Sequence, residues 1–135
     1  MALSADRIIT SRNEGKLTPA KVTGSATIYG GALVQRTTAT GLVLDATATT
    51  AATFAGVARE KVVGNSAATS QVALYQSGDF EFAIVGAAEG DCGSVAYISD
   101  DLTVTTTSTD SLACGKIVEY LSSTSIMLRI TGYAF

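Results

Sequence analysis

The chain has 135 residues, of which 47% are hydrophobic and 16% are charged, a composition too apolar for a disordered polypeptide. Its net charge of -3 and its isoelectric point of about 4.7 argue against an electrostatic grip on nucleic acid. No apolar run approaches the ~20 residues of a membrane-spanning helix, and early charges exclude a secretory signal. We therefore expect one domain that is made in a cytoplasm and contacts neither nucleic acid nor membrane.

Residues 1–21 differ in composition from the rest of the chain. They hold four of its nine basic residues and its only proline, Pro19, which favours an extended conformation at Thr18. We interpret this segment as an extended N-terminal arm that contains at most one short strand. Two explanations stay open: a frayed terminus, or an arm that becomes ordered on a partner.

The second explanation assigns candidate contact residues. Basic side chains would face an acidic partner surface, and one strongly apolar pair lies among them. The candidate partner-contact residues are Arg7, Ile8, Ile9, Arg12 and Lys16.

From Val22 onward, short β-rich segments alternate with turns. The strands predicted in the first half are 26–29, 33–36, 42–44 and 54–58, the last continuing through 62–63. Gly56 inside this pattern predicts a bulge or a close backbone approach. The Ala/Thr-rich segment 45–53 predicts a loop with at most one helical turn, because its threonines disfavour a long helix.

The second half shows clearer alternation of apolar and polar residues. Phe80, Phe82 and Ile84 are predicted to share one face of a strand, with Glu81 pointing away. The other strands predicted in this half are 71–76, 94–98, 102–105, 117–120 and 126–130. Strands that recur about every ten residues, without a helical period, predict an all-β fold. We expect a small single-domain β-barrel or β-sandwich over residues 22–135.

The sequence offers no recognisable catalytic apparatus. It contains no histidine, which excludes Ser-His-Asp and Cys-His catalysis and any His-ligated metal. The glycine-rich segment 86–93 lacks the Gly-Lys-Ser/Thr of a phosphate loop and is better explained by turns. No loop has the alternating carboxylates of a calcium site. We therefore predict no enzymatic activity, no metal and no cofactor.

The two cysteines, Cys92 and Cys114, lie far apart in sequence. Our interpretation is that both are small buried apolar residues, kept reduced in a cytoplasm. A disulfide stays open if their strands are neighbours, because spacing alone does not decide it.

Several motifs occur in a characteristic order. They are Ile28–Val34, Phe54–Ala58, Val72–Gly78, Gly90–Asp101, Gly115–Val118 and Ile126–Ile130. In order and spacing they resemble the small capsid cement, or head decoration, proteins of tailed bacteriophages. The resemblance covers roughly Val22 to Ile130, while the first twenty residues match no pattern of the family. The chain departs from the family at Cys92–Ser94, where an extra small-residue step precedes the next strand.

The resemblance implies a structural protein of the virion. Such proteins are compact β-domains, often homotrimers, that bind the major capsid protein outside an expanded head and stabilise it against internal DNA pressure. The alternative is a tail-fibre or receptor-binding module that recognises a carbohydrate or a surface protein. Sugar sites usually expose aromatic residues, whereas this chain has no tryptophan and few aromatics in predicted loops. An enzyme is the third and least supported reading.

Overall fold

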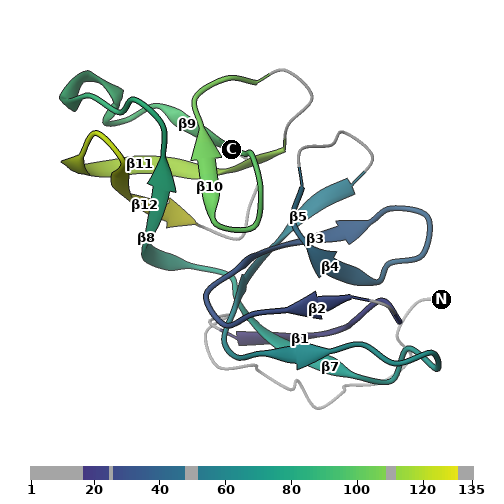
Figure 1. Ribbon diagram of the computed structural model, residues 1–135. Helices are drawn as coiled ribbons and strands as arrows, with labels where there is room; N and C mark the ends of the chain where they lie inside the picture. Colours follow the sequence, from purple (N-terminus) through teal and green to yellow (C-terminus); the bar gives the residue numbers. More distant parts are fainter. Residues whose placement is uncertain (1–16, 25, 48–51, 109–111, 131–135) are drawn as a thin grey trace, which may run out of the picture.

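The computed structural model describes residues 17–24, 26–47, 52–108 and 112–130, and within them the fold is all-β (Figure 1). One 3-10 turn, η2 (Glu89–Asp91), accompanies the strands, and the described residues form no α-helix. The strands are β1 (Leu17–Lys21), β2 (Thr27–Ile28), β3 (Leu33–Thr37), β4 (Val43–Asp45), β5 (Ala52–Ala58), β6 (Val62–Val63), β7 (Gln71–Tyr75), β8 (Gly78–Ile84), β9 (Val95–Ile98), β10 (Thr103–Thr105), β11 (Ala113–Ser122) and β12 (Ser125–Ile130).

The first lobe is a curled five-stranded sheet in the order β1-β7-β5-β3-β4. All of its neighbouring strands are antiparallel. Its two edges meet at a parallel bridge between Val22 and Val43, where the Thr23 amide donates to the Val43 carbonyl at 2.9 Å. The β2–β6 pair contributes Ile28 to the apolar cluster of this lobe. The sheet therefore encloses its own small core of Ala, Val, Ile and Leu side chains.

The second lobe is a closed barrel in the order β10-β8-β12-β11-β9. Only β10 and β8 run parallel, and the other pairs are antiparallel. Period-two alternation turns one face of each strand inward, as with Ile126, Leu128 and Ile130 on β12, which are all buried. Closure leaves this barrel without a free strand edge.

The lobes pack against each other as parts of a single domain (Figure 1). Leu33 and Val57 belong to the sheet of the first lobe but lie in the apolar cluster of the barrel. Their neighbours Val34 and Ala58 face the other cluster, as alternation along a strand requires. The Leu33 amide also donates to the Asp101 carbonyl at 2.8 Å, which joins the lobes directly.

The predicted class, a small all-β domain with a barrel, is confirmed. The alternation predicted for β8 is also confirmed, since Phe82 and Ile84 are buried and Glu81 is exposed. Gly56 has both predicted properties: the β3–β5 register shifts beside it, and a Cβ there would lie 2.6 Å from the Tyr75 carbonyl oxygen. Its φ of +147° also disfavours any other residue.

Several strand bounds differ from the predictions. β11 spans Ala113–Ser122, against the predicted 117–120, and β5 begins at Ala52, inside the predicted loop 45–53. The segment 54–63 is two strands and not one, because β5 ends at Ala58 and a bend carries the chain to β6, which pairs with β2. Leu17–Lys21, the end of the predicted arm, forms the short strand that the interpretation allowed, and it pairs with β7 along its whole length. The rest of the predicted arm, residues 1–16, lies outside the described residues.

Candidate functional surfaces

The five candidate contact residues all precede β1. Arg7, Ile8, Ile9, Arg12 and Lys16 lie outside the described residues, so their contacts stay a prediction. The next residue, Leu17, begins β1 at the edge of the first sheet. The N-terminal segment therefore leads directly into an edge strand of the first sheet.

Among the described residues, no strand pairs with the outer edge of β1 near its start. Pro19 pairs with Ala73, whose carbonyl accepts from the Arg59 amide on the β5 side at 3.0 Å. Because the Ala73 carbonyl points toward β5, Pro19 and Ala73 form a pair without mutual hydrogen bonds. The backbone polar groups of Pro19, and of Leu17 two residues earlier, therefore point away from β7. Proline has no amide hydrogen and is tolerated at such an edge. Because β4 is bridged only to Val22, just after the end of β1, the first part of β1 has no second strand neighbour among the described residues.

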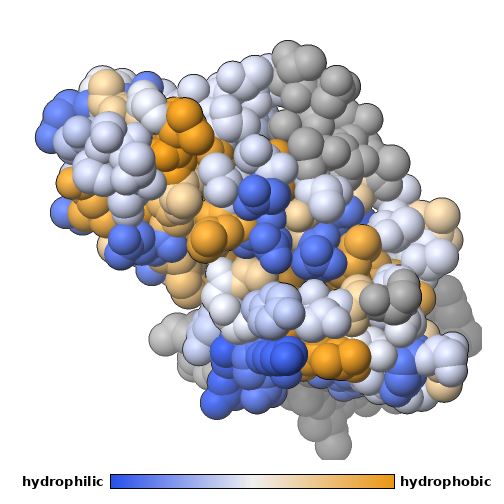
Figure 2. Space-filling view, in the orientation of Figure 1, coloured by the Kyte–Doolittle hydropathy of each residue, from blue (hydrophilic) through white to orange (hydrophobic). Residues whose placement is uncertain are grey.

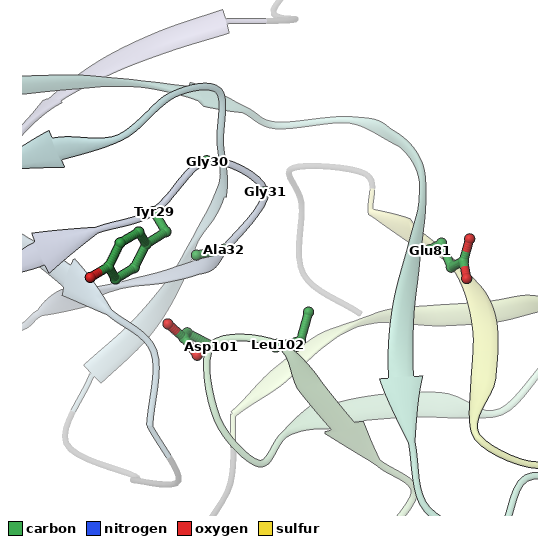
Figure 3. Close-up of a pocket in the computed structure, with 7 residues that line it drawn as sticks. All are labelled: Tyr29, Gly30, Gly31, Ala32, Glu81, Asp101 and Leu102. Atoms are coloured by element: carbon green, nitrogen blue, oxygen red, sulfur yellow. The ribbon is translucent and has the colours of Figure 1, made fainter.

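A groove of about 470 Å³ lies where the two lobes meet. The turn Tyr29–Ala32 of the first lobe forms one wall, and Glu81, Asp101 and Leu102 line the barrel side. Figure 3 shows Leu102 pointing into the space between the Gly30–Gly31 turn and β8. A second hollow of about 390 Å³ shares Glu81 and Leu102, so the depression extends along the barrel.

Two adjacent carboxylates beside the groove, Asp100 and Asp101, have pKa values shifted in opposite directions. Burial raises the pKa of the Asp101 carboxyl, and repulsion from Asp45 and Asp100 raises it further. For Asp100, burial opposes ionisation, but hydrogen bonds from the Leu102 and Thr103 amides, at 2.9 and 2.7 Å, bring its pKa below the ordinary value. Asp100 therefore stabilises the turn into β10, whereas Asp101 carries a charge that its surroundings disfavour.

Two polar contacts define the walls of the groove. The Lys61 ammonium lies 5.2 Å from the centroid of the Tyr29 ring, a cation–π contact that occupies one face of this exposed ring. On the opposite wall, Glu81 accepts a hydrogen bond from the Ser125 hydroxyl at 2.8 Å. Of the two carboxylates that line the groove, Glu81 is thus held by a side-chain hydrogen bond, whereas neither of these contacts involves Asp101.

Exposed apolar side chains occur on both lobes. Among the described large hydrophobic residues, Val85, just after β8, is the most exposed, at 88%, and Val118 and Leu121 are exposed on β11. Figure 2 shows separate orange patches among white and blue atoms and no continuous apolar face on this side. Scattered apolar residues are normal on a protein surface and do not by themselves mark an interface.

The cysteine prediction holds for one residue and is wrong for the other. Both thiols are free. Cys114 is buried on β11, where burial raises the pKa of its thiol to about 12. Cys92 is exposed, because it lies in the turn after η2 and not on a strand. The disulfide that the sequence left open is therefore not formed.

Two further carboxylates, Asp91 and Asp79, have structural partners. Asp91 accepts from the Ala88 amide at 2.9 Å, which agrees with the turn predicted for segment 86–93. Asp79 on β8 binds the Arg129 guanidinium on β12 through two contacts of 2.8 and 2.9 Å. The described part of the chain contains no group of three or more metal-binding side chains. It also contains no helix long and apolar enough to cross a membrane.

Comparisons with known proteins add no relative. No family model, no curated protein and no solved structure matches the chain.

Proposed function

We propose that this protein is a structural decoration, or cement, protein that binds the outside of an expanded phage head and stabilises it against internal DNA pressure. The observation that carries the proposal is the open edge of β1 directly after the basic and aliphatic segment 1–16. The resemblance of residues 22–130 to head decoration proteins supplies the class of partner, the major capsid protein.

An open strand edge is a suitable attachment point for a shell subunit. A strand added there would satisfy the outward backbone groups of Leu17 and Pro19 and gain affinity from main-chain hydrogen bonds. Arg7, Arg12 and Lys16 supply positive charge for an acidic shell surface, and Ile8 and Ile9 supply apolar area. The closed barrel offers no competing edge, which directs strand pairing to the first lobe.

A homotrimer would make this attachment strong. Three copies present the same weak contact three times, so that overall avidity exceeds each contact by about 10²–10⁴-fold. The protein would then act on the outer capsid surface of the virion after synthesis in the host bacterial cytoplasm. This role requires no cofactor and no nucleic-acid contact.

The proposal is tested by removing the segment while keeping β1. A chain that lacks residues 1–16 should keep its thermal unfolding midpoint but bind undecorated expanded heads at least about tenfold more weakly. Ile8→Asp should weaken binding in the same direction, and Val85→Asp, on the other lobe, is the matched control. Full-strength binding of the shortened chain would refute the role assigned to the segment.

A second candidate is a receptor-binding module that recognises a carbohydrate. It is favoured by Tyr29, an exposed aromatic ring that lines the same groove as Asp101 and Glu81. Against it, Lys61 already covers one face of that ring. A glycan-array screen that returns one specific ligand, lost in Tyr29→Ala, would favour this candidate over the cement role.

A further inference from the structure

We propose that the groove between the two lobes docks an arginine or lysine that a partner protein presents between aliphatic residues on an extended segment. The partner would be the shell subunit, so its identity, but not the chemistry of the groove, rests on the proposed function. The docking surface consists of Tyr29, the Gly30–Gly31 turn, Ala32, Asp101 and Leu102, with Glu81 on its rim.

The dimensions and lining of the groove suit a peptide segment. Its volume of about 470 Å³ falls in the range of roughly 300–1,000 Å³ that is typical of ligand sites. Two of the large hydrophobic residues that the described surface exposes, Tyr29 at 56% and Leu102 at 58%, line this one hollow. The Gly30–Gly31 turn carries no side chain, so a partner backbone can approach its polar groups closely. The hollow continues past Leu102, which leaves room for residues that flank the docked one.

Charge complementarity selects a cation for this groove. Asp101 lies beside Asp45 and Asp100, and their mutual repulsion is an energy that a docked cation would relieve. A guanidinium binds a carboxylate through two parallel hydrogen bonds, and its stem packs on apolar walls such as Leu102. Lys61 stays on the Tyr29 ring at the rim and leaves the Asp101 side of the groove without that cation.

The same contacts disfavour a sugar. A pyranose ring stacks on an aromatic face, and Lys61 already covers one of the two faces of Tyr29. Glu81, which could otherwise bind sugar hydroxyls, already accepts from the Ser125 hydroxyl. The groove thus places the Asp101 carboxylate next to aliphatic side chains. This lining suits a basic residue that is flanked by aliphatic residues.

The chemistry can be tested without phage heads. The isotope-labelled full chain is titrated with the peptide acetyl-Leu-Arg-Leu-amide, and amide chemical shifts are followed by NMR. We expect millimolar binding with shifts at Gly30, Gly31 and Leu102, and about tenfold weaker binding in Asp101→Asn, which a change of about 1.4 kcal/mol would produce. Glu119→Gln, an exposed change on β11, is the matched control and should bind like the wild type.

Three outcomes would overturn the inference. They are an absence of shifts, equal shifts with the peptide acetyl-Leu-Glu-Leu-amide, and shifts with methyl glucoside in place of the arginine peptide. Binding of Asp101→Asn and Leu102→Ser to undecorated heads then tests the partner separately. If the wild type binds the peptide but no head, the groove chemistry stands and the proposed function fails; if both variants bind heads like the wild type, the groove is not the shell contact.

Discussion

At the scale of single residues, backbone packing in the barrel depends on a glycine of β11. A Cβ at Gly115 would collide with the Arg129 carbonyl oxygen on β12, whereas a Cβ at Gly90 would meet no atom within 4 Å. We expect Gly115→Ala to lower the free energy of unfolding by about 1–3 kcal/mol through overpacking, and Gly90→Ala to change it by less than about 0.5 kcal/mol. Urea denaturation of both variants measures the difference, and equal stabilities would contradict the close approach.

The neighbouring carboxylates Asp100 and Asp101 should respond oppositely to neutralisation. The pKa of Asp100 is lowered by folding, so its contribution is present above the unfolded pKa and is lost as pH falls through the folded pKa. The pKa of Asp101 is raised, so the penalty of its charge grows as pH rises from the unfolded pKa through the folded pKa, and it is absent at low pH. At about pH 7 we expect Asp100→Asn to lower and Asp101→Asn to raise the melting temperature.

Scanning calorimetry between about pH 3 and pH 7 checks both signs. The two differences from the wild type should shrink together as the carboxylates become protonated. A stabilisation by Asp101→Asn that persists at the acid end would show that charge is not its cause.

The burial of single residues was predicted correctly where apolar residues recur with the two-residue period of a strand. Ile126, Leu128 and Ile130 were predicted to share one face of the last strand, and the structure buries all three. Cys92 could not be placed in this way, because residue type suggests burial while the turn that holds it leads outward. The groove residue Leu102 was assigned to a strand, and no local signal marked it as exposed lining of a hollow.

At the scale of secondary-structure elements, β1 is an integral strand of the first sheet and not only the connection to residues 1–16. It pairs with β7 over five positions and buries Ala20 and, just beyond its end, Val22. We expect removal of residues 1–16 to leave the free energy of unfolding within about 0.5 kcal/mol of the wild type. Removal of residues 1–21 should destabilise it by more than about 2 kcal/mol, because a ladder and part of a core face are lost.

Urea denaturation of the two shortened chains compares these effects directly. The longer truncation also exposes the edge of β7, so we expect it to aggregate more readily. Equal destabilisation by both truncations would mean that the first sixteen residues contribute to the domain itself.

Element positions were more predictable than their pairing. The predicted strands 71–76 and 94–98 follow from β-propensity and turn residues, and the structure has β7 and β9 there, each one residue shorter. Their neighbours are set by closure of the sheets over long sequence separations, as with the parallel pair β8 and β10, which no local pattern encodes. The two-residue strands β2 and β6 are too short for any periodicity, so β6 was merged with β5 in the prediction.

At the scale of the whole molecule, the lobes should unfold together. Leu33 is fully buried, belongs to the sheet of one lobe and packs in the core of the other. We expect Leu33→Ala to lower the free energy of unfolding by about 2–5 kcal/mol while unfolding stays a single transition. Val63→Ala, at an exposed position of the first lobe, is the control and should have little effect.

Calorimetry and near-ultraviolet circular dichroism should report coincident transitions for both variants. Two separated transitions, in the variant or in the wild type, would show that the interface through Leu33 does not couple the lobes. Coupling matters for the proposed role, because a rigid molecule transmits load between shell subunits better than two loosely joined lobes.

The cement role is tested most directly by co-sedimentation of the purified chain with undecorated phage heads in expanded and unexpanded forms. The cement role predicts saturable binding to expanded heads only, at a few copies per capsomer, and higher resistance of those heads to heat or loss of DNA. Absence of binding to either form, or equal binding to both without stabilisation, would contradict it.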